Sequence, residues 1–327
     1  MGYVAGELIK DDEYNTFVAS SSDPFGYNHF AGTGSGQYGL GQTELAQVAA
    51  GASNQVKAAS WNSLLAGIDN IANHTNDSMT ARGQVTAGDP IKIKSAVAAD
   101  LATLAASVAG GCTSATALTE SSELRSAAAS ARFSATHIVE HSVTFANGNN
   151  LRFFFNAGGK IRIKLTRTGN GGSAKTSKDD SVDELITALG NFDIGAQVST
   201  RSGSGENLET DGLANGVDDF GTSYTTIANI RQSSGTYTTM DLKIEGKVDN
   251  ATYGSAVKVT IKCSVIDADS GDSEFTDGNT DGVDQFANFI GVTDWGLFTV
   301  NPTTAQGLNP VYDISASAIE SNNVANG

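Results

Sequence analysis

Cysteine, basic side chains and long apolar runs are scarce in this chain, and each shortage excludes a class of protein. The two cysteines, Cys112 and Cys263, are too few for a disulfide scaffold or a four-cysteine zinc site. Lys and Arg number 20 against 36 Asp and Glu, so the net charge of −16 argues against nucleic acid as a main partner. No apolar run reaches the roughly 18 residues that a membrane-spanning helix needs, so we expect no membrane partner. The first residues have neither the basic start nor the apolar core of a secretory signal, and we expect none.

The remaining composition indicates a folded protein. Apolar residues make up 39% of the 327 residues and charged residues 17%, which is too apolar and too weakly charged for a disordered tail. The length favours two domains. Because the hydrophobic pattern changes from a helical to a strand period near residue 135, we place them at 1–135 and 136–327. The expected fold class is α+β, mostly β, with a small helical N-terminal module followed by an antiparallel β-sandwich-like domain.

The first domain contains one well-marked helix. Trp61, Leu64, Leu65 and Ile68 recur at helical spacing after Ser60, which is a suitable N-cap. This apolar face is large relative to the core that the surrounding sequence can build. We therefore expect Trp61, Leu64, Leu65 and Ile68 to form a docking helix that binds neighbouring copies or other proteins.

Two further helices are expected in this domain. One runs from Ser95 to Val108 and ends before the Gly110-Gly111 pair. The other is the Ala/Ser-rich stretch between residues 118 and 132. A Gly-rich, aromatic segment at residues 24–42 contains G-T-G-S-G-Q, but it lacks the flanking strand and helix of a dinucleotide loop, so we interpret it as a connector.

A faint repeat relates residues 9–17 to residues 56–64. Both read as a β-branched apolar residue, Lys, three linking residues, an aromatic residue, Asn, a small hydroxyl residue and an apolar residue. The aromatic and final apolar residues are three apart, so they share one helix face. A reused turn into a helix and a chance similarity are both compatible with this pattern.

The second domain alternates apolar and polar residues with a period of two, as antiparallel strands do. Strands are expected to end at an Asn147-Gly148 turn, to run through residues 151–155, and to cover residues 161–166, 240–245 and 257–265. An S-V-D-E capping box starts one inserted helix, at residues 181–190. Cys263 falls on a buried strand face and is expected to be a core residue.

The acidic residues concentrate in loops of this domain. Residues 201–327 hold 18 acidic and six basic side chains. A repeat, D-G-x-x-[N/D]-G-V-D-x-F, occurs at residues 211–220 and 277–286 and predicts tight turns anchored by Val and Phe. Beside the second copy, alternating carboxylates offer either a solvated turn or a structural calcium site, since calcium binds hard oxygens. The calcium ligands would be Asp267, Asp269, Asp272 and Glu274; no other cofactor is expected.

A small basic island interrupts this acidity, and it comprises Arg152, Lys160, Arg162, Lys164 and Arg167. Two interpretations stay open. The charges are either ordinary solvated surface, or the island of one copy meets acidic loops of another and steers assembly.

No catalytic constellation is evident. No G-x-S-x-G elbow is present, and neither cysteine has a neighbouring histidine. His137 and His141 are four apart, which places them on one face of a strand, but two histidines without a third ligand are weak support for a metal site. We expect ordinary strand residues there, and we expect no enzyme activity.

Two motifs resemble a known group of proteins. The first combines Gly39-Leu40-Gly41-Gln42, the V-K-A-A-S-W-N-S-L-L helix at residues 56–65, and Asn73-His74. The second is L-R-F-F-F-N-A-G-G-K-I-R-I at residues 151–163, which is the more specific. Both resemble uncharacterised virion structural proteins of tailed bacteriophages, of the tail, neck and baseplate group. The matched pieces cover about a quarter of the chain. The resemblance implies a structural part without enzyme chemistry.

Three functions are therefore considered. The first is a non-enzymatic component of a tailed-phage virion, assembled in the host cytoplasm and bound to its own copies and to other virion proteins. The second is a host-surface adhesin, fiber or decoration protein that binds glycans through the acidic Gly-Asp loops and Tyr224, Tyr237 or Tyr253. The third, a glycan-degrading enzyme, would need two carboxylates facing each other in a groove.

Overall fold

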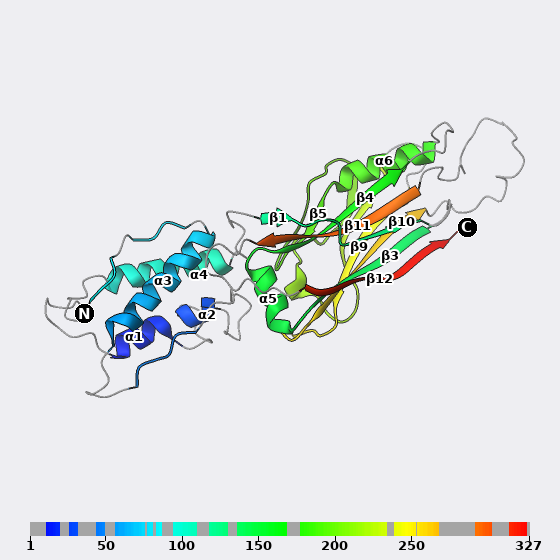
Figure 1. Cartoon of the computed structure of the whole chain (residues 1–327). Coiled ribbons are helices and arrows are strands. Elements are labelled where there is room, and N and C mark those ends of the chain that lie inside the picture. The colour runs from blue at the N-terminus through cyan, green and yellow to red at the C-terminus, as the bar shows by residue number, and fades with distance from the viewer. Residues whose placement is uncertain are drawn as a thin grey trace, which may run out of the picture. The chain divides into compact units, whose positions relative to one another are not determined.

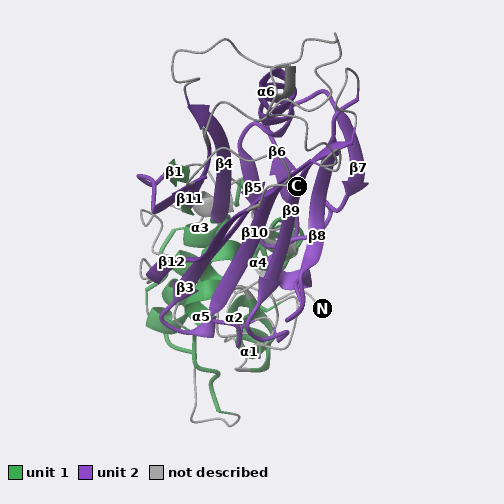
Figure 2. Cartoon of the chain, turned by 90° about the vertical axis from the view of Figure 1, so that its right-hand side faces the viewer, with its two compact units in different colours: residues 1–119, 149–159, 301–312 green, residues 120–148, 160–300, 313–327 purple. Residues whose placement is uncertain are grey.

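The structure is a computed structural model (Figure 1). It describes residues 11–19, 26–31, 44–49, 56–75, 77–80, 83–86, 94–109, 118–129, 136–168, 177–233, 239–252, 254–267, 292–302 and 314–325. The chain divides into two compact units (Figure 2). The first comprises residues 1–119, 149–159 and 301–312, and the second comprises residues 120–148, 160–300 and 313–327.

The first unit is helical. Its helices are α1 (Asp11–Val18), α2 (Tyr27–Ala31), α3 (Ala58–Thr75), α4 (Lys94–Ala109) and, apart from its first residue, α5 (Gly148–Asn156). Aromatic side chains form part of its core, because the Tyr14 and Phe17 rings of α1 pack against Trp61 of α3 with centroids 6.4 Å and 6.1 Å away. Tyr14 and Phe17 are the aromatic and the final apolar residue of the first repeat copy, and Trp61 is the aromatic residue of the second copy. The two copies therefore both form helices, and the helices contact each other.

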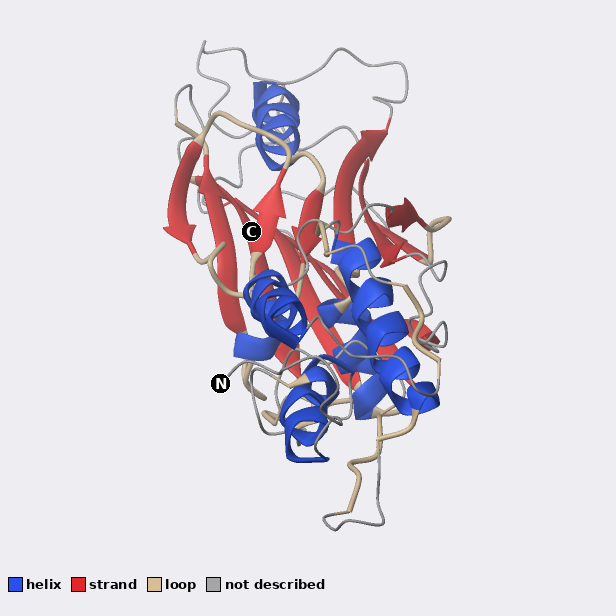
Figure 3. Cartoon of the chain, turned by 90° about the vertical axis from the view of Figure 1, so that its left-hand side faces the viewer, coloured by secondary structure: helices blue, strands red, loops and turns tan. Residues whose placement is uncertain are grey.

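The second unit contains two antiparallel sheets (Figure 3). One has the strand order β1-β11-β4-β5-β6, with β2 also paired to β11, and the other has the order β12-β3-β10-β9-β8-β7. The α+β, mostly β fold class is confirmed. The strands are β1 (Leu118–Glu120), β2 (Arg125–Ala128), β3 (Thr136–Phe145), β4 (Lys160–Thr168), β5 (Phe192–Ile194), β6 (Ser199–Arg201), β7 (Asn207–Asp211), β8 (Thr225–Arg231), β9 (Met240–Val248), β10 (Lys258–Asp267), β11 (Val292–Pro302) and β12 (Ile314–Ala325).

Alternating side chains build the core between the sheets. In the second sheet, Cys263 of β10 lies opposite Val139 of β3 and Ile244 of β9, and all three are fully buried. From the first sheet, Trp295 of β11 is also fully buried. Burial raises the pKa of the Cys263 thiol, because a thiolate would lose its hydration there. Cys263 is therefore a core residue, as expected.

Helix α6 (Ser177–Leu189) packs against β4 of one sheet and against β8 and β9 of the other. Its end was predicted correctly, because Gly190 adopts a φ of +58° and donates its N–H to the Ile186 carbonyl. Its start was wrong. Ser181 and Glu184 do not form the N-terminal capping box, because the helix begins four residues earlier and Ser181 is buried within it.

The expected strand at residues 151–155 is also wrong, because these residues belong to α5. The run of apolar residues is compatible with either structure, and the residues after it decide. Gly158, with a φ of +89°, donates its N–H to the Phe155 carbonyl, and Gly159 donates to the Phe154 carbonyl. These two hydrogen bonds form a Schellman motif, which ends a helix.

Three other expectations need correction. The stretch from residue 118 to 132 is not a helix, because β1 and β2 lie in it and β2 pairs with β11, placing Ala127 opposite Trp295. Residues 120–148 consequently belong to the second unit, rather than to a first domain ending at 135. Helix α3 begins at Ala58, and Trp61 donates its N–H to the Lys57 carbonyl, so Ser60 lies in the first turn and is not the N-cap.

Candidate functional site

The expected docking helix does not present a surface. Trp61, Leu64, Leu65 and Ile68 are 0–5% exposed and form the core of the helical unit. The interpretation of these residues as docking anchors is therefore corrected, because α1, α2 and α4 already pack against α3 or against each other. The sequence signal was the apolar stripe itself, which looks the same whether it is covered within the chain or by a partner.

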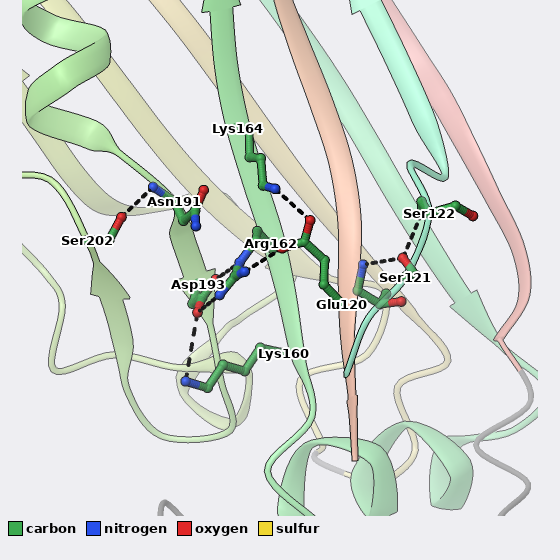
Figure 4. Close-up of polar contacts among 10 residues, drawn as sticks. Glu120, Ser121, Ser122, Lys160, Arg162, Lys164, Asn191, Asp193 and Ser202 are labelled. Atoms are coloured by element: carbon green, nitrogen blue, oxygen red, sulfur yellow. Dashed lines mark hydrogen bonds and ion pairs between the residues drawn. The ribbon is translucent and has the colours of Figure 1, made fainter. Parts of the chain in front are cut away.

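Three residues of the basic island, Lys160, Arg162 and Lys164, form ion pairs within the chain (Figure 4). Arg162 of β4 forms a two-point ion pair with Asp193 of β5, with N–O distances of 2.6 Å and 2.7 Å, and its third nitrogen lies 2.5 Å from Glu120. Lys164 lies 2.6 Å from the other oxygen of Glu120, and Lys160 lies 3.8 Å from Asp193. Lys160, Arg162 and Lys164 therefore hold β1, β4 and β5 together, and they are not an unpaired patch that awaits another copy.

These ion pairs set the charge state of their members. The hydrogen bond from Lys164, together with Arg162, holds the pKa of the Glu120 carboxyl below its usual value. Asp193 and Glu120 raise the pKa of the Arg162 guanidinium. The ion pairs therefore favour the charged forms of Glu120 and Arg162.

Arg152 and Arg167 lie apart from this network. Arg152 is on α5 in the helical unit, where it bonds Asn149 and its guanidinium carbon lies 5.0 Å from the Phe153 ring centroid. Arg167, near the end of β4, forms a two-point ion pair with Asp183 of α6 at 2.7 Å. The five residues of the predicted island therefore have three different structural roles.

Of the two acidic repeats, the structure describes the first. Val217 and Phe220 are 1% and 2% exposed, which confirms them as the anchors of the turn. The side chain of Asp211 accepts the Leu213 N–H at 3.2 Å, as expected for a tight turn. Burial and the neighbouring Asp219 raise the pKa of Asp218 to about 7.

The calcium hypothesis stays a prediction. Asp267 is the last residue of β10 and is buried, whereas Asp269, Asp272 and Glu274 lie outside the described residues, as does the second acidic repeat. Within the described residues, no group of three or more His, Cys, Asp and Glu side chains is arranged to hold a metal ion.

The two histidines of β3 link the sheets. His137 bonds Thr293 of β11 at 2.7 Å and Asn322 of β12 at 3.1 Å, and His141 lies 3.0 Å from the Trp295 carbonyl of β11. Burial lowers the pKa of both imidazoles, to about 4 for His141. Both histidines therefore lie on the face of β3 that packs against the other sheet.

Paired charges cover the outward face of the β12-to-β7 sheet. Glu140, Lys262 and Glu245 lie opposite one another on β3, β10 and β9. Lys262 lies 2.6 Å and Lys243 2.9 Å from the Glu245 carboxylate. Burial alone would raise the pKa of Glu245, but the two ammonium groups outweigh it and lower the pKa.

Tyr224 belongs to this face. The ammonium groups of Lys247 and Lys262 each lie 4.2 Å from its ring centroid. Burial and the nearby Glu140 carboxylate raise the pKa of its hydroxyl. Tyr224 is thus enclosed by charged side chains and offers no open aromatic platform, whereas Tyr237 and Tyr253 lie outside the described residues.

The edge strand β12 is the surface that the sequence analysis missed. It is 12 residues long, lies at one end of its sheet, and contains no Lys, Arg or Pro, the residues that usually block further pairing at an edge. Ile319 lies opposite His141, so it is on the core side of the sheet, yet it remains 40% exposed. The facing sheet, which contains β11 and β4, therefore leaves this part of the core face uncovered.

The rest of the strand is better protected. Asn322 of β12 donates to the Ala128 carbonyl of β2 at 2.8 Å, which joins the edges of the two sheets there. Glu320 is held by Lys258 and by the Ser142 hydroxyl, both at 2.6 Å. The open part is consequently the first half of β12, around Ile319.

Comparisons with known proteins give no identification. No protein-family model, no curated protein and no solved structure matches this chain. Among the helices of the described residues, none has both the length and the apolarity to cross a membrane.

Proposed function

We propose that this chain is a non-enzymatic structural component of a tailed-phage virion, in the tail, neck or baseplate region, and that it assembles with its own copies and with other virion proteins. Its Gly-rich, cysteine-poor composition and the two motifs that resemble phage virion proteins support this assignment. The region of the second motif, residues 151–163, contributes α5 and the start of β4. The motif similarity thus concerns a helix-to-strand connection.

The exposure of Ile319 is the observation that carries the proposal. An isoleucine on the core side of a β-sandwich is normally covered by the facing sheet, since burying it fully is worth about 1.5–3 kcal/mol. Here the side chain is left 40% exposed on an edge strand that contains no Lys, Arg or Pro. A strand or loop from a second copy would cover Ile319 and continue the sheet, as in β-strand addition.

The test compares two substitutions. Ile319→Lys places a charge on the open edge, whereas Val198→Lys changes the other exposed large apolar side chain of the described residues, at the β5–β6 turn. We expect light scattering to give a defined oligomer for the parent chain and for Val198→Lys. For Ile319→Lys, the dissociation constant of the oligomer should be at least tenfold higher. Val198→Lys should unfold at nearly the parent temperature, and both variants should keep the circular dichroism spectrum of the parent chain, so that loss of the oligomer is distinguished from loss of the fold.

A compact parent monomer at all concentrations would contradict the proposal. Oligomers of the same size and stability for the parent and Ile319→Lys would also contradict it. The same measurement in chelator addresses the calcium hypothesis and the adhesin alternative. That alternative has no support at Tyr224, because Lys247 and Lys262 lie over the ring on which a sugar would stack.

A further inference from the structure

The outer edge of β12 has no neighbouring strand in the described part of the chain. β12 lies at one end of its sheet, where β3 is the strand that pairs with it (Figure 2). The other sheet meets β12 at Asn322, whose side chain donates to the Ala128 carbonyl of β2. Residues 314–319 lie before this contact. Their backbone groups that point away from β3 can therefore pair with a further strand.

Side chains alternate regularly in the middle of this open edge. The pairing of β12 with β3 is irregular at residues 315 and 320, and it is regular between them. Ala318 lies opposite Ser142, whose hydroxyl bonds the Glu320 carboxylate at 2.6 Å, so both of these β12 side chains are on the outward face. Ser317 and Ile319 lie opposite buried core residues of β3 and are on the core side. Ala318 is thus the middle of a regular stretch from residue 316 to 320.

Charge distinguishes β12 from the other edges of the two sheets. Because the chain has a net charge of −16, copies repel each other, and contact is least costly where the local charge is lowest. The opposite edge strand, β7, contains Glu209 and Asp211 and directly follows Glu206. β12 contains one charged residue, Glu320, which Lys258 neutralises at 2.6 Å. Two copies of β12 can therefore approach each other, whereas two copies of β7 repel.

Length also favours β12 as its own partner. The strands at the edges of the first sheet, β1, β2 and β6, have three or four residues each, and β7 has five. β12 has 12 residues. Among the described edges, β12 is consequently the one that is both long and nearly uncharged.

From these observations we propose that β12 of one copy pairs with β12 of a second copy, antiparallel, about a two-fold axis that passes beside Ala318. An axis perpendicular to the sheet gives an antiparallel pair and keeps the core faces of both copies on the same side. The same patch then binds itself, as in other two-fold dimers. The inference rests on the proposed self-assembly, and it names the partner segment and the symmetry of the contact.

This register gives each side chain of the stretch a compatible neighbour. Ala318 lies opposite the partner's Ala318 on the outward face, where small side chains allow close approach. Ile319 lies opposite the partner's Ser317 on the core side, and the two isoleucines become diagonal neighbours, which long side chains can bridge. Glu320 lies opposite the partner's Ala316, so no like charges face each other. The pair therefore covers the exposed isoleucine of both copies at once.

A disulfide between identical positions tests the two-fold pairing. In Ala318→Cys the two Cα atoms would be about 4.5–5.5 Å apart, a distance that a disulfide spans. In the control Ala316→Cys, on the same face and exposed, the two copies of the residue would be offset by about 13 Å along the strands. Cys112→Ser is included in both, and Cys263 is fully buried. Under mild oxidation, Ala318→Cys should form a linked dimer about tenfold faster or more than Ala316→Cys.

Charge exchange at the same position gives a second readout. Ala318→Lys and Ala318→Glu each place like charges opposite each other in a dimer of one variant, so each alone should dissociate more readily than the parent. An equimolar mixture of the two, carrying different tags, should form mixed dimers, because the ammonium of one copy faces the carboxylate of the other. Circular dichroism spectra like that of the parent chain show that each variant is folded. A β12 that paired with a different segment would gain nothing from mixing.

The outcomes separate this inference from the proposed function. An oligomer that depends on Ile319, but shows neither the faster link of Ala318→Cys nor recovery on mixing, would overturn the two-fold pairing and leave the proposed function intact. Equal linking rates for Ala318→Cys and Ala316→Cys would overturn the register, and with it the axis beside Ala318. A parent chain that stays monomeric at all concentrations would overturn the proposed function itself.

Discussion

At the residue scale, the helical unit depends on a glycine that ordinary helix propensity would disfavour. Gly67 lies within α3, where alanine is normally better by about 1 kcal/mol. A Cβ at this position would come within 2.5 Å of the Tyr27 ring, which is itself buried. Burial raises the pKa of Tyr27 to about 12. The close approach of this ring therefore requires glycine.

Gly67→Ala should consequently destabilise the helical unit. We expect a loss of about 1–3 kcal/mol, typical of overpacking, against the gain from helix propensity. Thermal unfolding followed by circular dichroism measures it. Gly83→Ala is the control, because a Cβ there meets nothing within 4 Å; an equal or higher melting temperature for Gly67→Ala would contradict the packing argument.

At the element scale, the end of α5 shows how one position selects a helix over a strand. Gly158 has a φ of +89°, which side chains rarely adopt, and its N–H and that of Gly159 satisfy carbonyls of the last turn. Gly158→Ala should therefore cost about 1 kcal/mol, because alanine is strained in the left-handed region. The amides of residues 158 and 159, which donate these two hydrogen bonds, should exchange faster in this variant. Unchanged exchange there would mean that packing of the phenylalanines, rather than the Schellman motif, ends the helix.

At the scale of the second unit, the two sheets are linked by neutral histidines. His137 and His141 have pKa values lowered by burial, so the unfolded chain binds protons more readily than the folded chain below pH 6.5. The stability that His141 contributes should therefore be fully present above about pH 6.5 and should fall by up to roughly 1.4 kcal/mol per pH unit as the pH decreases toward about 4. His137 should act in the same direction. The nearby Asp294 carboxylate favours protonation of both rings and limits this loss.

Urea unfolding between pH 7.5 and 4.5 checks this dependence. His141→Phe should have the shallower slope, because it removes one titrating group from the core. Asp218 acts with the opposite sign: its pKa is raised to about 7, so it binds protons in the folded chain and costs stability as the pH rises from about 4 to 7. Asp218→Asn should accordingly steepen the loss of stability at low pH. Parallel curves for the parent and His141→Phe would show that His141 takes up its proton in the folded chain as readily as in the unfolded chain, and would contradict the lowered pKa.

The sequence by itself determined the features that depend on local patterns. Period-two alternation predicted β3, β4, β9 and β10, since each has one face on the core. The anchors Val217 and Phe220, the core position of Cys263 and the helices α3 and α4 were predicted for the same reason. The repeat that includes Asn15 and Asn62 was visible as well, but the hydrogen bonds of these two side chains to Val48 and Val85 were not, because those partners are 33 and 23 residues away.

Only the tertiary structure decided which partner each residue meets. From the sequence, the apolar stripe that includes Trp61 and Leu64 was interpreted as a docking face, but α1 packs against it in the structure. Arg162 was interpreted as part of a basic surface, but it forms ion pairs with Asp193 and Glu120. The exposure of Ile319 likewise depends on where the facing sheet stops. Burial and ion pairing depend on segments that are distant in sequence, so local hydrophobic patterns cannot predict them.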